Sequence, residues 1–322
     1  MSDTVSVNKL VKPLVEKLLD DANELNLDVN TSEGGATIID AGISSKGCLE
    51  SGRQITEICM GGLGYVSFSM TDTFSSWPLT IHVHSSNPII SCLASQYAGW
   101  NLSFVKDEDN FNALGSGPCR ALACKEDLFK DLNYKDKFFS TVVVMEVDKK
   151  PPQEIIDKIT HDCNISEKNL TVILTPTKSL SGCVQVVGRV LEVGMHKVHE
   201  LGFPLDKIVD GFGSAPLPPP APDFLIGMGR TNDAILYGGT VHLYVDVPDD
   251  EAYELAKRLP SSTSNDYGKT FSEIFKKYKY DFYKIDKMLF SPAKVIISSI
   301  KTGKSFTSGN INKDLIDESF NK

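Results

Sequence analysis

The spacing of apolar residues along the chain predicts its elements. From Val7 to Ala22, apolar side chains recur at every third or fourth position, which predicts an amphipathic helix. Short apolar or alternating runs predict strands at 36–41, 64–70, 79–84, 141–147, 170–174, 240–247 and 294–300. Helical patterns recur at 88–98, 153–163 and 183–201, and two more helices are expected between residues 247 and 294.

Strands and helices are mixed along the chain, and several strands follow one another with only a turn between them. This order favours an α+β fold, with mixed sheets and helices, over a regular alternation of strand and helix. A length of 322 residues is sufficient for two medium-sized domains. The charged segment Asp148–Pro152 is the expected boundary. It gives an N-terminal domain at 1–150 and a C-terminal domain at 151–322, a division compatible with segments exchanged between the two.

Charge and composition narrow the classes of partner. The net charge of -9 argues against nucleic acid or an anionic membrane as the partner, because phosphate groups would be repelled over most of the surface. No apolar run approaches the roughly 20 residues of a membrane helix, and the first residues show no export signal. The seven cysteines include no Cys-x-x-Cys pair, which favours reduced thiols and a cytoplasmic location.

A polar stripe runs along the predicted helix at 183–201. Its members are Gln185, Arg189, Glu192, His196 and His199, which recur in steps of four, three, four and three. A solvated face with an Arg189–Glu192 pair is the plainest interpretation. Solvated faces usually carry lysine and glutamate, however, so the two histidines and the glutamine favour the wall of a pocket.

Two kinds of chemistry fit this stripe. In the first, Glu192 is an acid or base and Arg189 holds its charge or a water molecule. In the second, Glu192, His196 and His199 bind a metal ion through one carboxylate and two imidazoles, although no second cluster of ligands elsewhere in the sequence completes the coordination.

A glycine-rich turn precedes a helical run at Gly115-Ser-Gly-Pro-Cys-Arg120. Backbone N–H groups at such a helix start, with Ser116, Gly117 and Arg120 beside them, are suited to binding a phosphate. The turn lacks the Lys-Ser/Thr of a nucleotide-binding loop, and many such turns only cap a helix.

The stretch from Gly227 to Gly239 combines glycines with Arg230, Asn232 and Asp233. Glycines allow a backbone to approach a ligand closely, and these polar residues orient polar ligands. We interpret the stretch as the wall of a binding site; the alternative is a tight turn in which Asn232 and Asp233 cap their own backbone. Before it, 210–222 is expected to form a loop rich in glycine and proline, whose proline-rich end forms an extended wall.

Four segments together resemble the methenyltetrahydromethanopterin cyclohydrolase family. They are Gly115–Ala121, Gly188-Arg-Val-Leu-Glu192, Asp210-Gly-Phe-Gly-Ser-Ala-Pro216 and the run Gly-Arg-Thr-Asn-Asp-Ala-Ile-Leu-Tyr-Gly-Gly that ends at Gly239. The resemblance extends over nearly the whole chain. The length of the chain and the order of its motifs also agree with those of the family.

The resemblance implies reversible hydrolysis of N5,N10-methenyltetrahydromethanopterin to the N5-formyl form, in one-carbon metabolism of the methanogenesis type. It implies two α+β domains with the substrate in a cleft between them, a homotrimer, and no metal or prosthetic group. The family's Arg-x-x-Glu pair falls on Arg189 and Glu192, and its phosphate pocket is assigned to Gly115–Arg120. Gln185, Arg230, Asn232 and Asp233 are the further expected substrate contacts.

The chemistry of such a substrate suits these residues. The substrate is an amidinium-like cation whose carbon is already electrophilic, so a single carboxylate, Glu192, can act as base and then as acid. Two alternatives remain at this point: a metal-dependent hydrolase that uses Glu192, His196 and His199, and a pterin-binding protein without catalysis.

Overall fold

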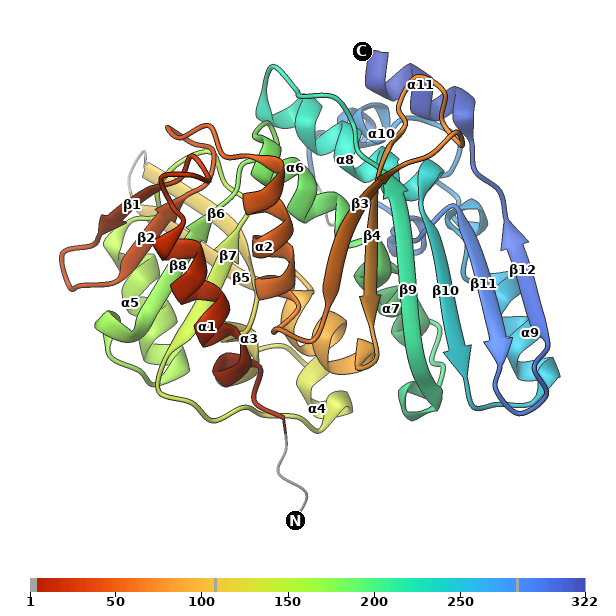
Figure 1. The fold of residues 1–322 in the computed structure, drawn as a ribbon, viewed down its shortest axis with the longest axis horizontal. Coiled ribbons are helices and arrows are strands. Elements are labelled where there is room, and N and C mark those ends of the chain that lie inside the picture. Colours follow the sequence, from red (N-terminus) through yellow and green to blue (C-terminus); the bar gives the residue numbers. More distant parts are fainter. Residues whose placement is uncertain (1–4, 107–108, 282–283, 322) are drawn as a thin grey trace. The chain divides into compact units, whose positions relative to one another are not determined.

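The computed structural model describes residues 5–106, 109–281 and 284–321 (Figure 1). The chain forms two compact units: unit 1 contains Met1–Leu63 and Ile90–Gln185, and unit 2 contains Gly64–Ile89 and Val186–Lys322. The predicted boundary after residue 150 falls inside unit 1. Residues 64–89 come from the first half of the chain and belong to unit 2. The first four residues, which the expectation about an export signal concerns, lie outside the described residues.

Unit 1 contains a six-stranded sheet in the order β1-β2-β8-β7-β6-β5. Its strands are β1 (Asp28–Thr31), β2 (Thr37–Asp40), β5 (Trp100–Lys106), β6 (Asp109–Ser116), β7 (Thr141–Met145) and β8 (Leu170–Leu174). Its helices are α1 (Val7–Asp20), α2 (Leu49–Cys59), the π-helix η1 (Ile89–Gln96), α3 (Cys119–Ala123), α4 (Leu128–Leu132), α5 (Gln153–Cys163), the short 3-10 helix η2 (Glu167–Asn169) and α6 (Leu180–Val187). Strands β2, β8 and β7 are parallel, and the outer pairings are antiparallel.

The central strands of unit 1 bury both faces, which explains their unbroken apolar sequences. In β7, Val142 and Val144 pack in a cluster with α1 and α2, whereas Val143 and Met145 pack in a second cluster with α5. Because successive side chains of a strand point to opposite faces, the run Thr-Val-Val-Val-Met supplies two cores at once.

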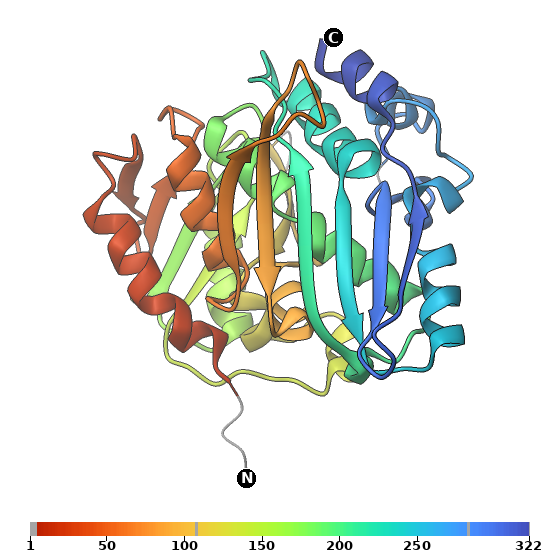
Figure 2. The same ribbon diagram turned by 45° about the vertical axis from the view of Figure 1, so that its right-hand side comes forward.

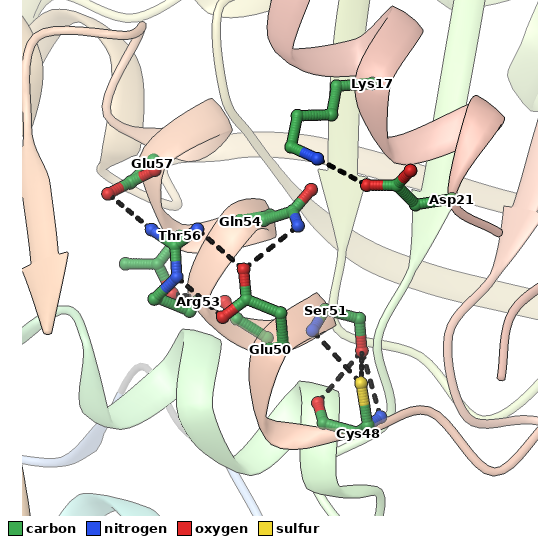
Figure 3. A network of polar contacts seen from close by, with 10 residues as sticks. Lys17, Asp21, Cys48, Glu50, Ser51, Arg53, Gln54, Thr56 and Glu57 are labelled. Atoms are coloured by element: carbon green, nitrogen blue, oxygen red, sulfur yellow. Dashed lines mark hydrogen bonds and ion pairs between the residues drawn. The ribbon is translucent and has the colours of Figure 1, made fainter. Parts of the chain in front are cut away.

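Helix α2 begins at a capping box and carries a charged network on its exposed side (Figure 3). The Cys48 backbone N–H donates to Ser51 Oγ at 2.9 Å, and the Ser51 N–H donates to Cys48 Sγ at 3.3 Å. Arg53 donates through two nitrogens to Glu50, at 2.7 and 2.8 Å, and its third nitrogen lies 2.8 Å from Glu57. This network ties together successive turns of one helix.

Unit 2 contains a second six-stranded sheet, in the order β12-β11-β10-β9-β4-β3. Its strands are β3 (Tyr65–Met70), β4 (Leu79–Ser85), β9 (Ile208–Pro216), β10 (Thr240–Val245), β11 (Lys294–Ser299) and β12 (Ser305–Gly309). Its helices are α7 (Val190–Glu200), α8 (Phe224–Gly238), α9 (Asp249–Arg258), α10 (Phe271–Lys277) and α11 (Lys313–Asn321), with short 3-10 helices η3 (Leu205–Lys207), η4 (Ser261–Thr263) and η6 (Lys287–Leu289). Only β10 and β11 are parallel among these pairings.

Helices α7, α8 and α9 pack against the sheet of unit 2, and α10 and α11 contact α8. Helix α7 contacts β4, β9 and β10, and α9 contacts β11 and β12. Figure 2 shows the strands in front of α7, with their other face turned towards the viewer. The described parts of both units thus confirm the predicted α+β class, with mixed sheets in each. Within the described ranges, no helix has both the length and the apolar character needed to cross a bilayer.

Most predicted elements are confirmed, and three are corrected. The helix expected at 183–201 is two helices, α6 and α7, separated at Gly188 and Arg189. The loop expected at 210–222 begins as strand β9, and the glycine-rich stretch Gly227–Gly239 lies almost entirely within helix α8 instead of forming an irregular wall or a turn. The hairpin β5–β6 and the elements β1, α2, α4, β12 and α11 were missed.

Candidate active site

The predicted acid/base pair lies at the start of helix α7. Arg189 is the residue that precedes the helix, and Glu192 is in its first turn. Both residues are buried: Arg189 is 8% exposed and Glu192 is 4% exposed. Because both residues are buried, they do not form the solvated helix face that is the plainest interpretation of the sequence.

Two glycines of β9 allow α7 to lie directly on the sheet. A Cβ atom at Gly211 would lie 2.9 Å from Leu191 Cδ1. A Cβ atom at Gly213 would lie 2.9 Å from Val190 Cγ1 and 3.1 Å from the backbone nitrogen of Leu191. The segment Asp210-Gly-Phe-Gly therefore forms a strand that has no side chains at the two positions where the first turn of α7 packs against it. This contact positions the backbone of Glu192.

The side chains of Arg189 and Glu192 lie within electrostatic contact of each other. Arg189 Nη1 lies 3.8 Å from Glu192 Oε2. This is longer than the 2.7–2.9 Å typical of a charge-assisted hydrogen bond, so the contact is electrostatic and not a closed bidentate pair. The backbone N–H groups of the first helical turn also favour a negative charge at Glu192. The site can hold a carboxylate in its ionised form beside a fixed positive charge.

The histidines of α7 do not join Glu192 in a metal site. His196 Nε2 lies 3.7 Å from Glu200, one turn further along the helix, and His199 is in the last turn. Among residues 5–106, 109–281 and 284–321, no three His, Cys, Asp or Glu side chains are grouped so that they would hold a metal ion. The ligand set Glu192, His196 and His199 is therefore not assembled.

Gln185 is buried near the end of α6, at 1% exposure, and is the last residue of unit 1. Arg189 and Glu192 belong to unit 2. The predicted stripe thus begins on one helix and continues on another.

The predicted phosphate-binding turn leads from strand β6 into a short helix, as expected from the sequence. Gly115 and Ser116 end strand β6, Gly117 has a φ of 96°, and α3 is a helix of only five residues. Ser116 Oγ donates to the carbonyl of Gln96 at 2.6 Å.

Arg120 faces the interior of unit 1. Its guanidinium donates to both oxygens of Glu126 and to the carbonyls of Leu93 and Ser95, at 2.6–3.3 Å. The rings of Tyr97 and Phe129 lie 5.0 and 5.3 Å from its Cζ atom. These contacts give Arg120 a structural role, and binding a substrate phosphate would require it to leave Glu126.

The polar residues of the glycine-rich stretch hold α8 in place. Arg230 Nη1 donates to the carbonyls of Pro219 and Pro220, and the amide of Asn232 donates to Met228 O at 2.9 Å. Asp233 is fully buried, and its two oxygens accept from the Phe271 N–H at 2.8 Å and from Ser319 Oγ at 2.6 Å. Asp233 therefore connects α8 to α10 and α11.

Comparison with known proteins identifies the family. The family model described as Cyclohydrolase (MCH) matches residues 6–320. The chain belongs to this family. A methenyltetrahydromethanopterin cyclohydrolase of Methylobacillus flagellatus is 58% identical over 98% of this chain and 95% of its own length. Proteins of the same name from Xanthobacter autotrophicus and Methanothermobacter marburgensis are 51% and 40% identical, over 98% of this chain in both cases and over 93% and 99% of their own lengths.

The sequence of this cyclohydrolase-family chain did not lead us to predict one buried charged side chain. Lys197 is fully buried in α7, and its Nζ donates to Pro260 O, Thr263 Oγ1 and Met288 O at 2.7–2.8 Å. The sequence does contain a signal, because Lys197 lies three residues after Gly194 and four before Leu201, among the apolar residues of the helix. The ammonium group attaches α7 to the loops that contain η4 and η6.

Because of Lys197, the free energy of unfolding should rise with pH. Burial lowers the pKa of Lys197 from 10.5 to about 8, and the nearby Asp286 carboxylate only partly opposes that shift. Between these two values the unfolded chain binds a proton that the folded chain does not. The contribution of Lys197 to the free energy of unfolding therefore increases from pH 8 to 10.5, by up to about 3 kcal/mol.

Urea unfolding of the parent protein and of Lys197→Met, measured at several values between pH 7.5 and 10, isolates this contribution. The difference in free energy of unfolding should shift in favour of the parent as the pH rises. Parallel pH curves for the two proteins would contradict the shift.

Proposed function

We propose that this chain is a methenyltetrahydromethanopterin cyclohydrolase, the activity named for its relatives. The observation that supports it best is the buried Arg189–Glu192 pair at the start of α7, in a chain that matches the cyclohydrolase family over residues 6–320. An acid/base group held in a fixed and largely dry position is what hydration of a cationic carbon needs.

In the proposed reaction, water adds to the methenyl carbon that bridges N5 and N10. As the C–O bond forms, Glu192 takes a proton from the water, and the positive charge of the substrate is neutralised. Glu192 then gives a proton to N10 while the C–N10 bond breaks. The hydroxyl proton leaves to solvent as the formyl C=O forms on N5, so the overall reaction consumes one water and releases one proton.

Arg189 has a positioning role in this proposal. Its guanidinium restrains the Glu192 carboxylate, and the pair together is close to neutral, so the arginine does not leave a net positive charge opposite a cationic substrate. An ionised Glu192 attracts the cation and can accept the proton from water in the first step.

The proposal also covers the location, the oligomeric state, the cofactor requirement and the substrate contacts of the protein. The protein acts in the cytoplasm as a homotrimer, and no metal ion or prosthetic group takes part. Gln185, buried shortly before the pair in the sequence, is retained as a substrate contact. Arg120, Arg230, Asn232 and Asp233 make the internal contacts described above, and the proposal does not depend on them.

The test is to mix the purified protein with methenyltetrahydromethanopterin and follow loss of the methenyl chromophore, with and without a chelator. Rapid loss that the chelator leaves unchanged is expected. Tight binding with loss only at the spontaneous rate would identify a carrier. Loss that the chelator abolishes and added metal restores would identify a metal-dependent hydrolase.

A further inference from the structure

An extended segment of unit 1 runs past the first turn of α1. It connects α4 to β7 (Figure 1). The side chain and the backbone N–H of Asn8 both donate to Asp136 Oδ2, at 2.8 and 2.9 Å. Both residues are buried, and nearby Tyr134 Oη donates to Val5 O at 2.7 Å. These contacts hold the segment 134–139 against the start of α1.

The residues of this segment are alternately buried and exposed. Tyr134 and Asp136 are buried, whereas Lys135, Lys137 and Phe139 are exposed. Such alternation is expected for an extended chain, because successive side chains point to opposite sides. Two lysines and a phenyl ring therefore project from the same side of the segment.

Helix α1 places two more lysines beside this ring. Lys9 and Lys12 are exposed, and Lys12 Nζ lies 5.4 Å from the centre of the Phe139 ring. The centre of the Phe138 ring lies 4.5 Å from that of Phe139. We call these six residues the basic patch: Lys9, Lys12, Lys135, Lys137, Phe138 and Phe139.

The basic patch differs in charge from the rest of the chain. Residues 5–12 and 134–139 contain four lysines and one acidic residue, the buried Asp136, in a chain whose net charge is -9. Within the described part of the chain, Lys9, Lys135 and Lys137 form no ion pair. Their ammonium groups are therefore available to the carboxylates of another molecule, and the local positive field attracts an acidic partner.

A cavity of about 450 Å³ adjoins the basic patch and shares Lys135 with it. Lys125 and Lys130 also line this cavity. Glu126, which lines it too, is only 14% exposed at its side chain and is neutralised by Arg120 at 2.6 Å. The cavity therefore extends the basic surface and has room for a side chain of a partner.

We infer that the basic patch binds an acidic segment of another protein, one that carries an apolar side chain between its carboxylates. The carboxylates pair with Lys9, Lys135 and Lys137. The apolar side chain packs on the ring of Phe139, which is 56% exposed. Lysines clustered around an exposed ring offer charge pairing and apolar contact in one small area. The patch lies within unit 1, whereas Glu192 belongs to unit 2, and binding here does not depend on the proposed reaction.

The surroundings of the patch favour a narrow acidic segment over a broad anionic surface. Glu16 pairs with Lys12 at 3.8 Å and Asp127 pairs with Lys130 at 2.6 Å, and the two acidic side chains are 61% and 94% exposed. A membrane or a nucleic acid would bring its phosphate groups close to these carboxylates as well. A peptide covers only the patch. Because exposed ion pairs are weak, Lys12 and Lys130 can exchange their present partners for those of the peptide.

The experiment measures the fluorescence anisotropy of a fluorescein-labelled polyglutamate peptide with one central phenylalanine. The parent protein should bind this peptide saturably and more tightly than polyglutamate without the phenylalanine, and added salt should weaken the binding. Lys137→Glu and Phe139→Ser should each weaken binding by about tenfold or more, because each removes one of the two kinds of contact. Both residues are exposed, so both variants should fold and keep the parent rate of chromophore loss.

A matched pair of control residues lies on α9. Lys257 Nζ is 5.8 Å from the centre of the Tyr253 ring, and the two side chains are exposed as in the basic patch. The same helix carries three acidic residues in its first turn, Asp249, Asp250 and Glu251. Lys257→Glu and Tyr253→Ser should therefore leave binding of the peptide unchanged.

Four outcomes would overturn the inference. They are no saturable binding of the peptide to the parent, equal binding of the two peptides, equal effects of the patch variants and the α9 controls, and tighter binding of the parent to another anionic probe. The other probes are vesicles of phosphatidylglycerol and phosphatidylcholine, and an oligothymidylate. Tighter binding to either would indicate a membrane or a nucleic acid in place of an acidic protein segment. Chromophore loss in the same samples separates a failure of the basic patch from a failure of the proposed activity.

Discussion

Glu192→Gln is expected to lower turnover by about 10²- to 10⁴-fold, the range typical for removal of a general acid/base group. The substituted amide keeps the size of the side chain but neither takes a proton from water nor delivers one to N10. Substrate affinity should fall less than turnover, because the substitution keeps the size of the side chain and removes only its charge and its ability to transfer a proton. Steady-state rates of chromophore loss, together with binding measured by fluorescence or calorimetry, give the two quantities separately.

A matched control lies on the same helix. Glu200→Gln changes a glutamate in the last turn of α7 that pairs with His196 at 3.7 Å and is distant from the first turn. It should retain nearly the parent rate. If Glu192→Gln turned over as fast as Glu200→Gln, Glu192 would have no part in the proton transfers, and the proposed mechanism would be wrong.

Arg120→Met is expected to destabilise the protein by about 3–5 kcal/mol, the loss typical when one partner of a buried ion pair is removed. The guanidinium is fully buried, and Glu126, only 14% exposed at its side chain, would be left without its partner. The carbonyls of Leu93 and Ser95 would each lose the hydrogen bond from Arg120, although the Ser95 carbonyl keeps the one from the Gly117 N–H at 2.9 Å. Urea unfolding monitored by circular dichroism measures the loss, which should appear as a lower midpoint with an unchanged slope.

Arg53→Met in α2 is the matched control for Arg120→Met. Arg53 contacts two carboxylates, Glu50 and Glu57, but its side chain and that of Glu50 are 24% and 48% exposed (Figure 3). Water can replace most of the interactions of such a partly exposed network. The expected loss of unfolding free energy is therefore below about 1 kcal/mol. Equal losses for the two variants would show that burial does not determine the strength of the Arg120–Glu126 pair.

Sequence reasoning succeeded where one local pattern determined the structure. Strand β8 and helix α5 have the predicted bounds, because an apolar run and a helical period are each sufficient to specify them. The Arg189–Glu192 pair was found from its spacing, and its burial agrees with a pocket wall better than with a solvated face.

Where it failed, the deciding partner is distant in the sequence. Glycine and proline in 210–222 indicated a loop, but Gly211 and Gly213 are bare so that α7 can approach the strand. Similarly, the glycines of 227–239 are tolerated inside α8, because Gly229 leaves room for Ser272 at the start of α10. The burial of Lys197 depends on acceptors from Pro260 and Met288, more than 60 residues further along the chain. No local pattern contains that information.

The placement of the hairpin β3–β4 in unit 2 has a consequence for biosynthesis. This hairpin is made early, but β4 pairs with β9, which follows about 120 residues later. At 5–20 residues per second, a ribosome needs roughly 6–25 s to deliver β9. During that time the hairpin has an unpaired edge that is open to wrong partners. The order of the segments therefore sets an interval during synthesis in which the nascent chain exposes an unpaired strand edge.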